Sequence, residues 1–120
     1  MIFNNDKAIY LQMAERMADE ILAGKYADDE RIPSVREYAV LLQVNTNTAV
    51  KAYEQLARDG VIYNKRGLGY FVIPGAQQKI LAARKMEFLQ VTVPQLSRQM
   101  QLLDISPEEM TEHIRKAFKA

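Results

Sequence analysis

Apolar residues recur at steps of three and four near the start of the chain. In the segment KAIYLQMAERMADEILAG they form one stripe, consisting of Tyr10, Met13, Met17 and Ile21. Ala14 and Ala18 stand beside that stripe. The pattern predicts an amphipathic helix with Asn5 or Asp6 as N-cap and Gly24 as the C′ residue that stops it.

Two shorter helical patterns follow the polar loop KYADDERIP. In SVREYAVLLQ, Ser34 and Glu37 have the spacing of a capping box, in which each side chain satisfies a backbone N–H of the first turn. In VNTNTAVKAYEQLARDG, Asn45 or Thr46 is the expected N-cap, and Gly60 ends the helix. The positions expected to face inward are Tyr38, Ala39, Leu42, Ala49, Ala52, Tyr53 and Leu56. Two helices joined by so tight a turn predict a helix-turn-helix.

The next segment, VIYNKRGLGYFVIPG, places strand-forming residues on both sides of a glycine-bearing turn. These residues are Val61, Ile62 and Tyr63 before the turn and Tyr70, Phe71, Val72 and Ile73 after it. They predict a β-hairpin closed by Pro74-Gly75, with either Tyr70 or Phe71 in the core. A phosphate-cradling loop is disfavoured, because such a loop leads into a helix whose N-terminus faces the anion, and here a strand follows.

Beyond Gly75 the pattern is helical again. It predicts one helix from about Gln77 to Leu103, kinked or restarted at Pro94, because proline lacks the N–H and clashes with the preceding turn. A last helix starts with Ser106 as N-cap, Pro107 at N1 and Glu109 at N3. The apolar members are Ile80, Leu81, Met86 or Phe88, Leu89, Leu96, Met100 and Leu103, then Met110, Ile114 and Phe118.

A tail of this size has too little core to be stable alone. We therefore expect residues 76–120 to be a helical dimerisation segment covered by the same segment of a second copy. The expected dimer contacts are Leu81, Phe88, Leu89, Leu96, Met100, Leu103, Met110, Ile114 and Phe118. The fold class is then mainly α with a small β-hairpin (α+β), in which residues 1–75 form the first domain.

Composition narrows the class of protein. The chain has 120 residues, of which 48% are hydrophobic and 26% charged, as in ordinary globular domains. It has no cysteine and a single histidine, His113, which argues against disulfides and against thiolate or histidine-rich metal sites. The loop Asp28-Asp29-Glu30 could hold a hard cation, but a charged surface loop is the favoured interpretation. No nucleophile with a neighbouring base and no cofactor fingerprint is recognisable, so we expect neither an enzyme nor a cofactor.

Targeting signals and net charge give only weak indications of location and partner. The opening MIFNNDKAIYLQ lacks a signal-peptide pattern, and no apolar stretch is long enough to span a membrane, so a cytoplasmic protein is expected. The net charge is only +1: residues 1–75 carry 9 Lys+Arg against 10 Asp+Glu, and residues 76–120 carry 7 against 5. If the protein binds nucleic acid, its cations must gather on one face.

A helix, a helix-turn-helix and a two-stranded wing, in this order, make a winged helix. Over residues 9–73 the chain resembles the N-terminal DNA-binding domain of GntR-type bacterial transcription regulators, and the matching blocks are ILAG, RIPSVRE, VNTNTAVKAYEQL, DGVI and GLGYFV. The remaining residues are similar to the short helical tail of the YtrA-like branch, notably LLDISPEEMTEHI. The resemblance implies a homodimeric repressor, often of an operon for membrane transport. A two-fold dimer predicts an inverted-repeat operator in double-stranded DNA; no small-molecule effector can be named.

The chain departs from the family's pattern at three positions. Many members have glycine where Asp29 stands, although aspartate tolerates the left-handed conformation better than most residues. Many also have arginines where Thr46 and Val50 stand. Since those arginines read guanine, a base preference does not carry over to this chain.

The outer face of the second helix of the helix-turn-helix holds the first group of candidate DNA contacts. With the inward positions removed, that face consists of Thr46, Asn47, Thr48, Val50, Lys51 and Glu54. Asn47 could pair with adenine and Val50 could meet a thymine methyl group. Thr46, Thr48 and Lys51 suit phosphates near a helix N-terminus. The alternative is capping plus a solvated face.

Candidate contacts also lie outside that helix. In the family, the arginine that matches Arg36 contacts DNA; otherwise Arg36 would form a surface ion pair. Lys65 and Arg66 would enter a minor groove or hold phosphates, while Gly67 and Gly69 would let the backbone come close. The alternative there is a solubilising turn. The rival function is a winged helix that binds another protein and has no reason to gather these cations.

Overall fold

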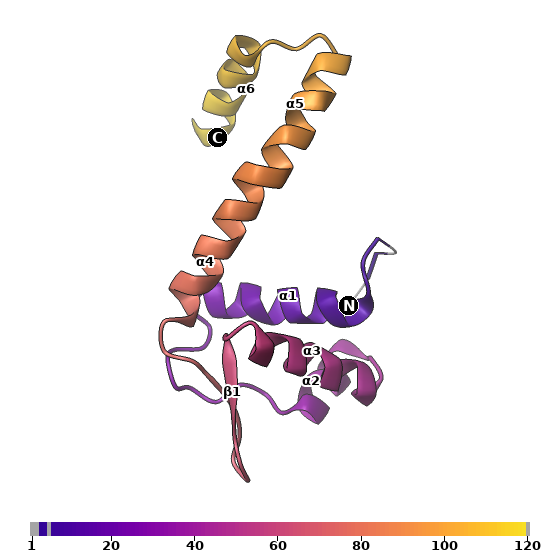
Figure 1. Cartoon of the computed structure of the whole chain (residues 1–120), viewed down its shortest axis with the longest axis vertical. Coiled ribbons are helices and arrows are strands. Elements are labelled where there is room, and N and C mark those ends of the chain that lie inside the picture. The colour runs from indigo at the N-terminus through magenta and orange to yellow at the C-terminus, as the bar shows by residue number, and fades with distance from the viewer. Residues whose placement is uncertain (1–2, 5, 120) are drawn as a thin grey trace. The chain divides into compact units, whose positions relative to one another are not determined.

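The computed structural model describes residues 3–4 and 6–119 (Figure 1). The chain divides into two compact units, Met1–Ala82 and Ala83–Ala120, and each is described by itself. None of the helices in the described ranges is long and apolar enough to cross a membrane.

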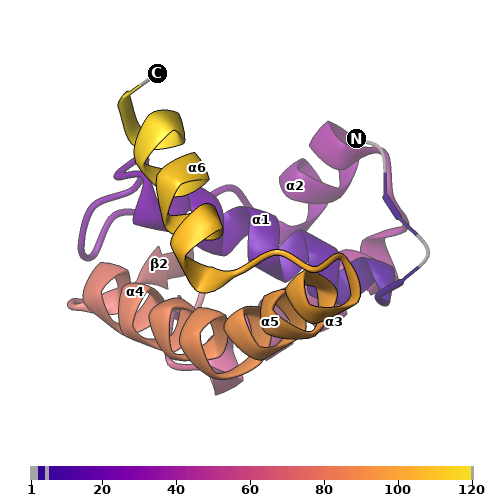
Figure 2. The same cartoon turned by 90° about the horizontal axis from the view of Figure 1, so that it is seen from above.

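The first unit is a winged helix. It contains α1 (Ile9–Leu22), α2 (Val35–Leu42), α3 (Thr46–Arg58), the strands β1 (Ile62–Lys65) and β2 (Gly69–Val72), and the first part of α4 (Ala76–Glu87). The two strands pair antiparallel, with Ile62 opposite Val72 and Lys65 opposite Gly69. Helix α1 lies against α3 (Figures 1 and 2), and the hairpin projects past α2 and α3 (Figure 1). The predicted mainly helical fold with a small hairpin is confirmed.

The core is the cluster that the periodicities predict. All seven residues expected to face inward on α2 and α3 are buried, as are Met13, Met17 and Ile21 of α1, whereas Tyr10 is only half-buried. The Tyr53 ring meets Tyr70 of the wing edge to face, with centroids 5.1 Å apart, and its hydroxyl donates to the Pro33 carbonyl at 2.6 Å. Tyr53 therefore ties α3 to both the wing and the start of α2.

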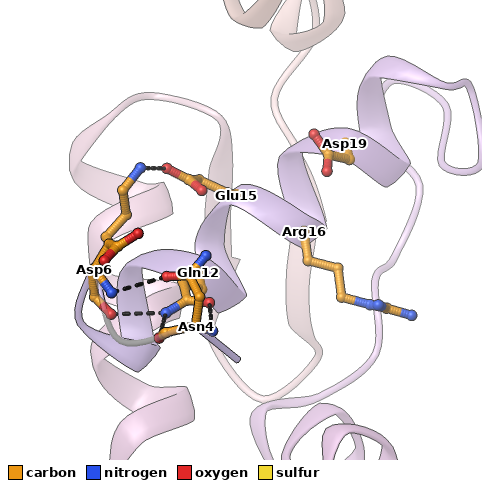
Figure 3. Close-up of a pocket in the computed structure, with 7 residues that line it drawn as sticks. Asn4, Asp6, Gln12, Glu15, Arg16 and Asp19 are labelled. Atoms are coloured by element: carbon orange, nitrogen blue, oxygen red, sulfur yellow. Dashed lines mark hydrogen bonds and ion pairs between the residues drawn. The ribbon is translucent and has the colours of Figure 1, made fainter. Parts of the chain in front are cut away.

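The start of α1 differs from the prediction. The helix begins at Ile9, its N-cap is Ala8, and no side chain caps it. The expected cap at Asp6 is wrong, and Asn5 lies outside the described residues. Instead, the amide of Gln12, buried in the first helical turns, donates to the carbonyls of Asn4 at 2.9 Å and Lys7 at 2.7 Å and accepts from the N–H of Asn4 at 3.2 Å (Figure 3).

The segment that precedes α2 pairs with β2 through an isolated β-bridge, which the sequence pattern does not predict. Arg31 forms a β-bridge with Phe71, and the flanking bonds run from the Asp29 N–H to the Val72 carbonyl at 2.8 Å and from the Ile32 N–H to the Tyr70 carbonyl at 3.0 Å. Asp29 does adopt the left-handed conformation expected of it, with φ 61°. The wing is thus anchored on the loop that precedes α2.

The first turns of α4 belong to the winged-helix unit. Ala76 and Ile80 are buried in its core, and the amide of Gln77 donates to the Leu22 carbonyl at 2.8 Å. The first compact unit consequently extends to Ala82, beyond the boundary that the sequence predicts after Gly75. A proline-glycine pair marks a turn, but it does not mark where packing against the core ends.

The second unit contains the end of α4, the π-helix η1 (Phe88–Thr92), α5 (Val93–Leu102) and α6 (Pro107–Lys119). The helical path passes Pro94 through the wider π turn, and α5 restarts with Pro94 in its first turn. Proline has no N–H to donate to the preceding turn, and its ring clashes with the carbonyl there. The wider π turn before it makes room for the ring and removes the need for that hydrogen bond. At α6 the predicted cap is present, since the Ser106 hydroxyl accepts from the Glu109 N–H at 3.1 Å.

Apolar side chains of the second unit are poorly covered. Leu102 is 85% exposed and Phe118 87%, while Leu89, Leu103 and Ile114 are exposed as well. The half-buried apolar residues are Val93, Leu96, Met100, Ile105 and Met110, and no described residue of α5 or α6 is buried. This unit has apolar stripes without a core of its own.

Candidate nucleic-acid interface

The turn between α2 and α3 is short because two residues adopt special conformations. Gln43 takes the left-handed conformation, with φ 57°, and its N–H reaches back to the carbonyls of α2. Asn45 is the N-cap of α3, and its side chain accepts from the Asn47 N–H at 2.7 Å. This turn sets α3 directly after α2 and leaves the outer face of α3 free.

That outer face carries the residues that the pattern predicts for DNA contact. Thr46, Asn47, Lys51 and Glu54 are exposed, and Val50 is 37% exposed. Thr48 is half-buried, so less of its side chain is available than the sequence suggests. Asn47, Lys51 and Glu54 follow one another at helical spacing, which sets an amide, a cation and a carboxylate along a single line on the helix.

Arg36 lies in the first turn of α2 and is exposed. A cation at this end of a helix gains nothing from the helix dipole, which favours anions there. The next residue, Glu37, completes the capping box with Ser34: its carboxylate accepts from the Ser34 N–H at 2.8 Å, and its own N–H donates to the Ser34 hydroxyl at 3.1 Å. The backbone N–H and then the hydroxyl of Ser34 stabilise the carboxylate and lower the pKa of Glu37, and the positive charge of Arg31 adds to this effect.

The wing ends in a three-residue turn between Lys65 and Gly69. The Leu68 N–H donates to the Lys65 carbonyl at 2.8 Å, and Gly67 has φ 78° with open space where a Cβ would stand. Behind the turn, Tyr70 packs against the core and Phe71 lies on the outer face. Both are only half-buried, so neither is the full member of the core that the sequence pattern predicts. The Phe71 ring stacks on Tyr63 with centroids 5.8 Å apart, and the Lys65 Nζ lies 4.9 Å from the centroid of Phe71.

The cations on these surfaces lack acidic partners. Within the described ranges, ion pairs join Lys7 to Glu15, Arg16 to Glu20 and Arg115 to Glu112. No described carboxylate lies at ion-pairing distance from the cations of the interface, which are Arg36, Lys51, Lys65 and Arg66. Their charges remain available for phosphates, which is the arrangement that a nearly neutral chain needs to bind DNA.

The acidic loop before α2 has a structural role. Asp28 accepts from the Gly75 N–H at 3.3 Å, Asp29 from the Tyr63 hydroxyl at 2.8 Å, and Glu30 from the Ala27 N–H at 2.8 Å. Among the described residues, no group of carboxylates and histidines is arranged to hold a metal ion, and His113 is exposed on α6.

A further cation, Arg31, lies in this region, and the sequence pattern does not predict it there. The Nε of Arg31 lies 3.1 Å from the position that a Cβ would take at Gly69, so its side chain lies across the base of the wing turn. Of the two glycines of the wing turn, Gly69 therefore faces Arg31, and only Gly67 has open space where a Cβ would stand. Only the pairing of residues 29–32 with β2 reveals this position.

Taken together, the tight turn, the free face of α3 and the cationic wing define a winged helix-turn-helix protein of the DNA-binding class. The family model for bacterial regulatory proteins of the gntR family matches residues 9–72, and the chain belongs to this family of transcription regulators.

Relatives and solved structures agree with this membership. The chain is 31% identical to the uncharacterized HTH-type transcriptional regulator YhcF of Bacillus subtilis, over 94% of this chain and 92% of that protein. It is also 31% identical to the HTH-type transcriptional repressor YtrA of Bacillus subtilis, over 90% of this chain and 82% of the repressor. A crystal structure of a GntR-family protein from Bacteroides thetaiotaomicron is 46% identical, with a TM-score of 0.80 over 92% of this chain and 97% of that one.

A fourth comparison concerns DNA directly. The DNA-binding domain of AraR, in a crystal structure with its operator ORX1, is 29% identical to this chain with a TM-score of 0.53. The match covers 59% of this chain and 92% of that domain. The shared part therefore corresponds to a winged helix that binds an operator.

Proposed function

We propose that this regulator represses transcription by binding an operator as a homodimer, with α3 in the major groove and the wing beside it. The observation that carries the proposal is that the cations of α2, α3 and the wing are exposed and have no described carboxylate at ion-pairing distance. Two relatives support it, since YtrA is a repressor and the AraR domain is seen with its operator. Such a protein works in the cytoplasm, where bacterial DNA is.

The residues of α3 divide between reading bases and holding phosphates. Asn47 has the amide that pairs with adenine, and Val50 presents an apolar surface to a thymine methyl group. Thr46, Thr48 and Lys51 contact phosphates from the first turns of the helix, where free N–H groups also favour anions. Arg36 contacts the sugar-phosphate backbone of DNA from α2. Lys65, Arg66 and the glycines of the turn contact the DNA backbone from the wing.

The second unit joins two copies. Its exposed leucines, Phe88, Ile114 and Phe118 need a partner that an isolated chain does not provide, and a second copy offers the same apolar surface. Within this unit the buried contact would comprise Phe88, Leu89, Leu96, Met100, Leu103, Met110, Ile114 and Phe118; Leu81, at the end of the first unit, would add to it. A two-fold dimer binds an inverted repeat, because the symmetry of the protein is matched in its site. Similarity to the YtrA-like branch points to an operon for membrane transport as the target.

Selection of bound duplexes from random DNA, followed by footprinting, tests the whole proposal. An inverted repeat protected on both halves is expected. A single asymmetric half-site with one protein bound would contradict the dimeric mode, and the absence of salt-dependent duplex binding would contradict DNA binding itself. The latter result would restore the rival function, a winged helix that binds another protein, which the similarity to a DNA-bound relative does not favour.

A further inference from the structure

Arg31 lies on the outer face of the wing. It stands opposite Phe71 in a β-bridge, and Phe71 in turn stands opposite Tyr63. Residues directly opposite one another on antiparallel strands project to the same face of a sheet. The side chains of Arg31 and Phe71 therefore share the face turned away from Tyr70 and the core.

Lys65 reaches the same small area. It stands opposite Gly69, and its Nζ lies over the Phe71 ring. Arg31 lies against Gly69, which has φ 109° and no Cβ to displace the guanidinium. Two cations thus cover the stretch from Gly69 to Phe71, and no described carboxylate is at ion-pairing distance from either. Two positive charges near one another repel, and a bound anion would relieve this repulsion.

Arg31 is also near the beginning of α2. After the hydrogen bonds of Ser34, the charge of Arg31 contributes to the lowered pKa of Glu37, the residue next to Arg36. The carboxylate of Glu37 is already engaged by the Ser34 N–H. Arg31 thus belongs to the segment that pairs with the wing at Phe71 and leads, five residues on, to Arg36 of α2.

We propose that Arg31 is a DNA-phosphate contact, so that the binding surface runs from the wing turn at Arg66 back along the outer face to Arg31. The inference rests on the proposed binding of duplex DNA and adds to it a residue that reads no base. A guanidinium can hold a phosphate through two parallel N–H bonds, and its contact with Gly69 fixes the side chain before DNA arrives. Arg31 thereby joins the contacts of the wing to that of α2.

The test compares three variants of the full chain by salt titration on duplexes of random sequence and on the selected operator. Arg31→Gln removes the charge, and Arg31→Lys keeps it without the fork of N–H groups. Arg58→Gln is the control, because Arg58 is an exposed arginine in the last turn of α3 that donates to Gln55 at 3.0 Å. Circular dichroism and thermal melting establish that each variant is folded.

Arg31→Gln should weaken binding to both duplexes alike and make the slope of log affinity against log salt shallower by about 0.9. Raising the salt from about 50 to about 200 mM should then cost this variant about threefold less affinity than it costs the wild type. Arg31→Lys should keep the wild-type slope, as should Arg58→Gln.

A wild-type slope for Arg31→Gln, in a protein that binds DNA and loses slope when Lys65 and Arg66 are removed, would overturn the inference and leave the proposed function intact. An equal loss of slope for Arg58→Gln would also overturn it, because the effect would then reflect net charge alone. If the wild type shows no salt-dependent binding, the proposed function fails first, and this inference fails with it.

Discussion

At the scale of single residues, the proposed function divides the candidate side chains into those that read bases and those that only hold phosphates. Asn47 is the clearest candidate for base reading, because its backbone N–H donates to the N-cap Asn45 while its side chain is exposed on the outer face of α3. An amide can form two hydrogen bonds with adenine, and a phosphate contact carries no such information.

Replacing Asn47 with alanine should therefore cost on the order of 1–3 kcal/mol of binding free energy on the preferred operator and little on random DNA. Fluorescence anisotropy on both duplexes, at one fixed salt concentration, measures the difference. An equal loss on the two duplexes would mean that Asn47 holds the backbone or the fold instead of reading a base.

Glu37 makes a prediction about stability and pH. Its folded-state pKa lies below the ordinary value of 4.5, mainly through the hydrogen bonds with Ser34. A carboxyl group with a lowered pKa contributes stability that is fully present above its unfolded pKa and is lost as the pH falls through its folded pKa. This contribution should be present at neutral pH and disappear in the acid range below 4.5.

Glu37→Gln keeps a partner for the Ser34 N–H and removes the charge, so it isolates the effect of ionisation. Urea unfolding at neutral pH should show the wild type to be the more stable protein, and the gap should close as the pH falls below 4.5. A gap that does not change with pH would show that the charge of Glu37 is irrelevant and that only its hydrogen bond matters.

At the scale of elements, the wing is a two-stranded hairpin that hydrogen bonds hold to the loop before α2. Lys65 and Arg66 stand where the turn begins, both exposed, and the aromatic pair Tyr63 and Phe71 supports the strands behind them. A rigid hairpin with cations at its end loses little conformational freedom when it meets DNA.

Replacing both Lys65 and Arg66 with alanine should weaken binding to all duplexes alike. Each lost phosphate contact should make the slope of log affinity against log salt shallower by about 0.9. Alanine at Arg115 and Lys116, two adjacent exposed cations of α6, is the matched control for the change in net charge. If the wing variant retains the wild-type affinity and slope, the wing is only a turn.

At the scale of the whole molecule, the proposed function assigns DNA binding to the first compact unit and dimerisation to the second. The first unit has a complete core that includes Ala76 and Ile80, so it can be cut after Ala82 without exposing that core. The second unit has exposed apolar stripes on η1, α5 and α6.

A chain that ends at Ala82 should therefore be a folded monomer, while the full chain is a dimer. Sedimentation equilibrium of the two proteins at the same concentrations measures the difference, and circular dichroism establishes that the shorter chain is folded. A dimeric chain ending at Ala82 would place the self-association in the winged helix and contradict the assignment of residues 83–120.

Much of the fold could be predicted because its signals are local. The helical periods, the capping box at Ser34 and Glu37, the N-cap at Asn45 and the glycine turn of the wing depend on residues a few positions apart. The exposed candidates on α3 follow from the same periods, because removing the inward positions leaves them on the outer face. All of these features are determined by short stretches of sequence.

Tertiary structure decided what depends on residues far apart in the chain. The start of α1 is set by Gln12 and not by a cap residue, and residues 29–32 pair with β2 only because that strand has a free edge. Ala76 and Ile80 join the core because α4 packs on it, and Arg31 enters the candidate interface because folding brings it against Gly69. The partners of Gln12 are only five and eight residues away, but they lie outside the helix; in the other cases the partner is distant in sequence. In all of them the structure depends on hydrogen bonds or burial that form only on folding.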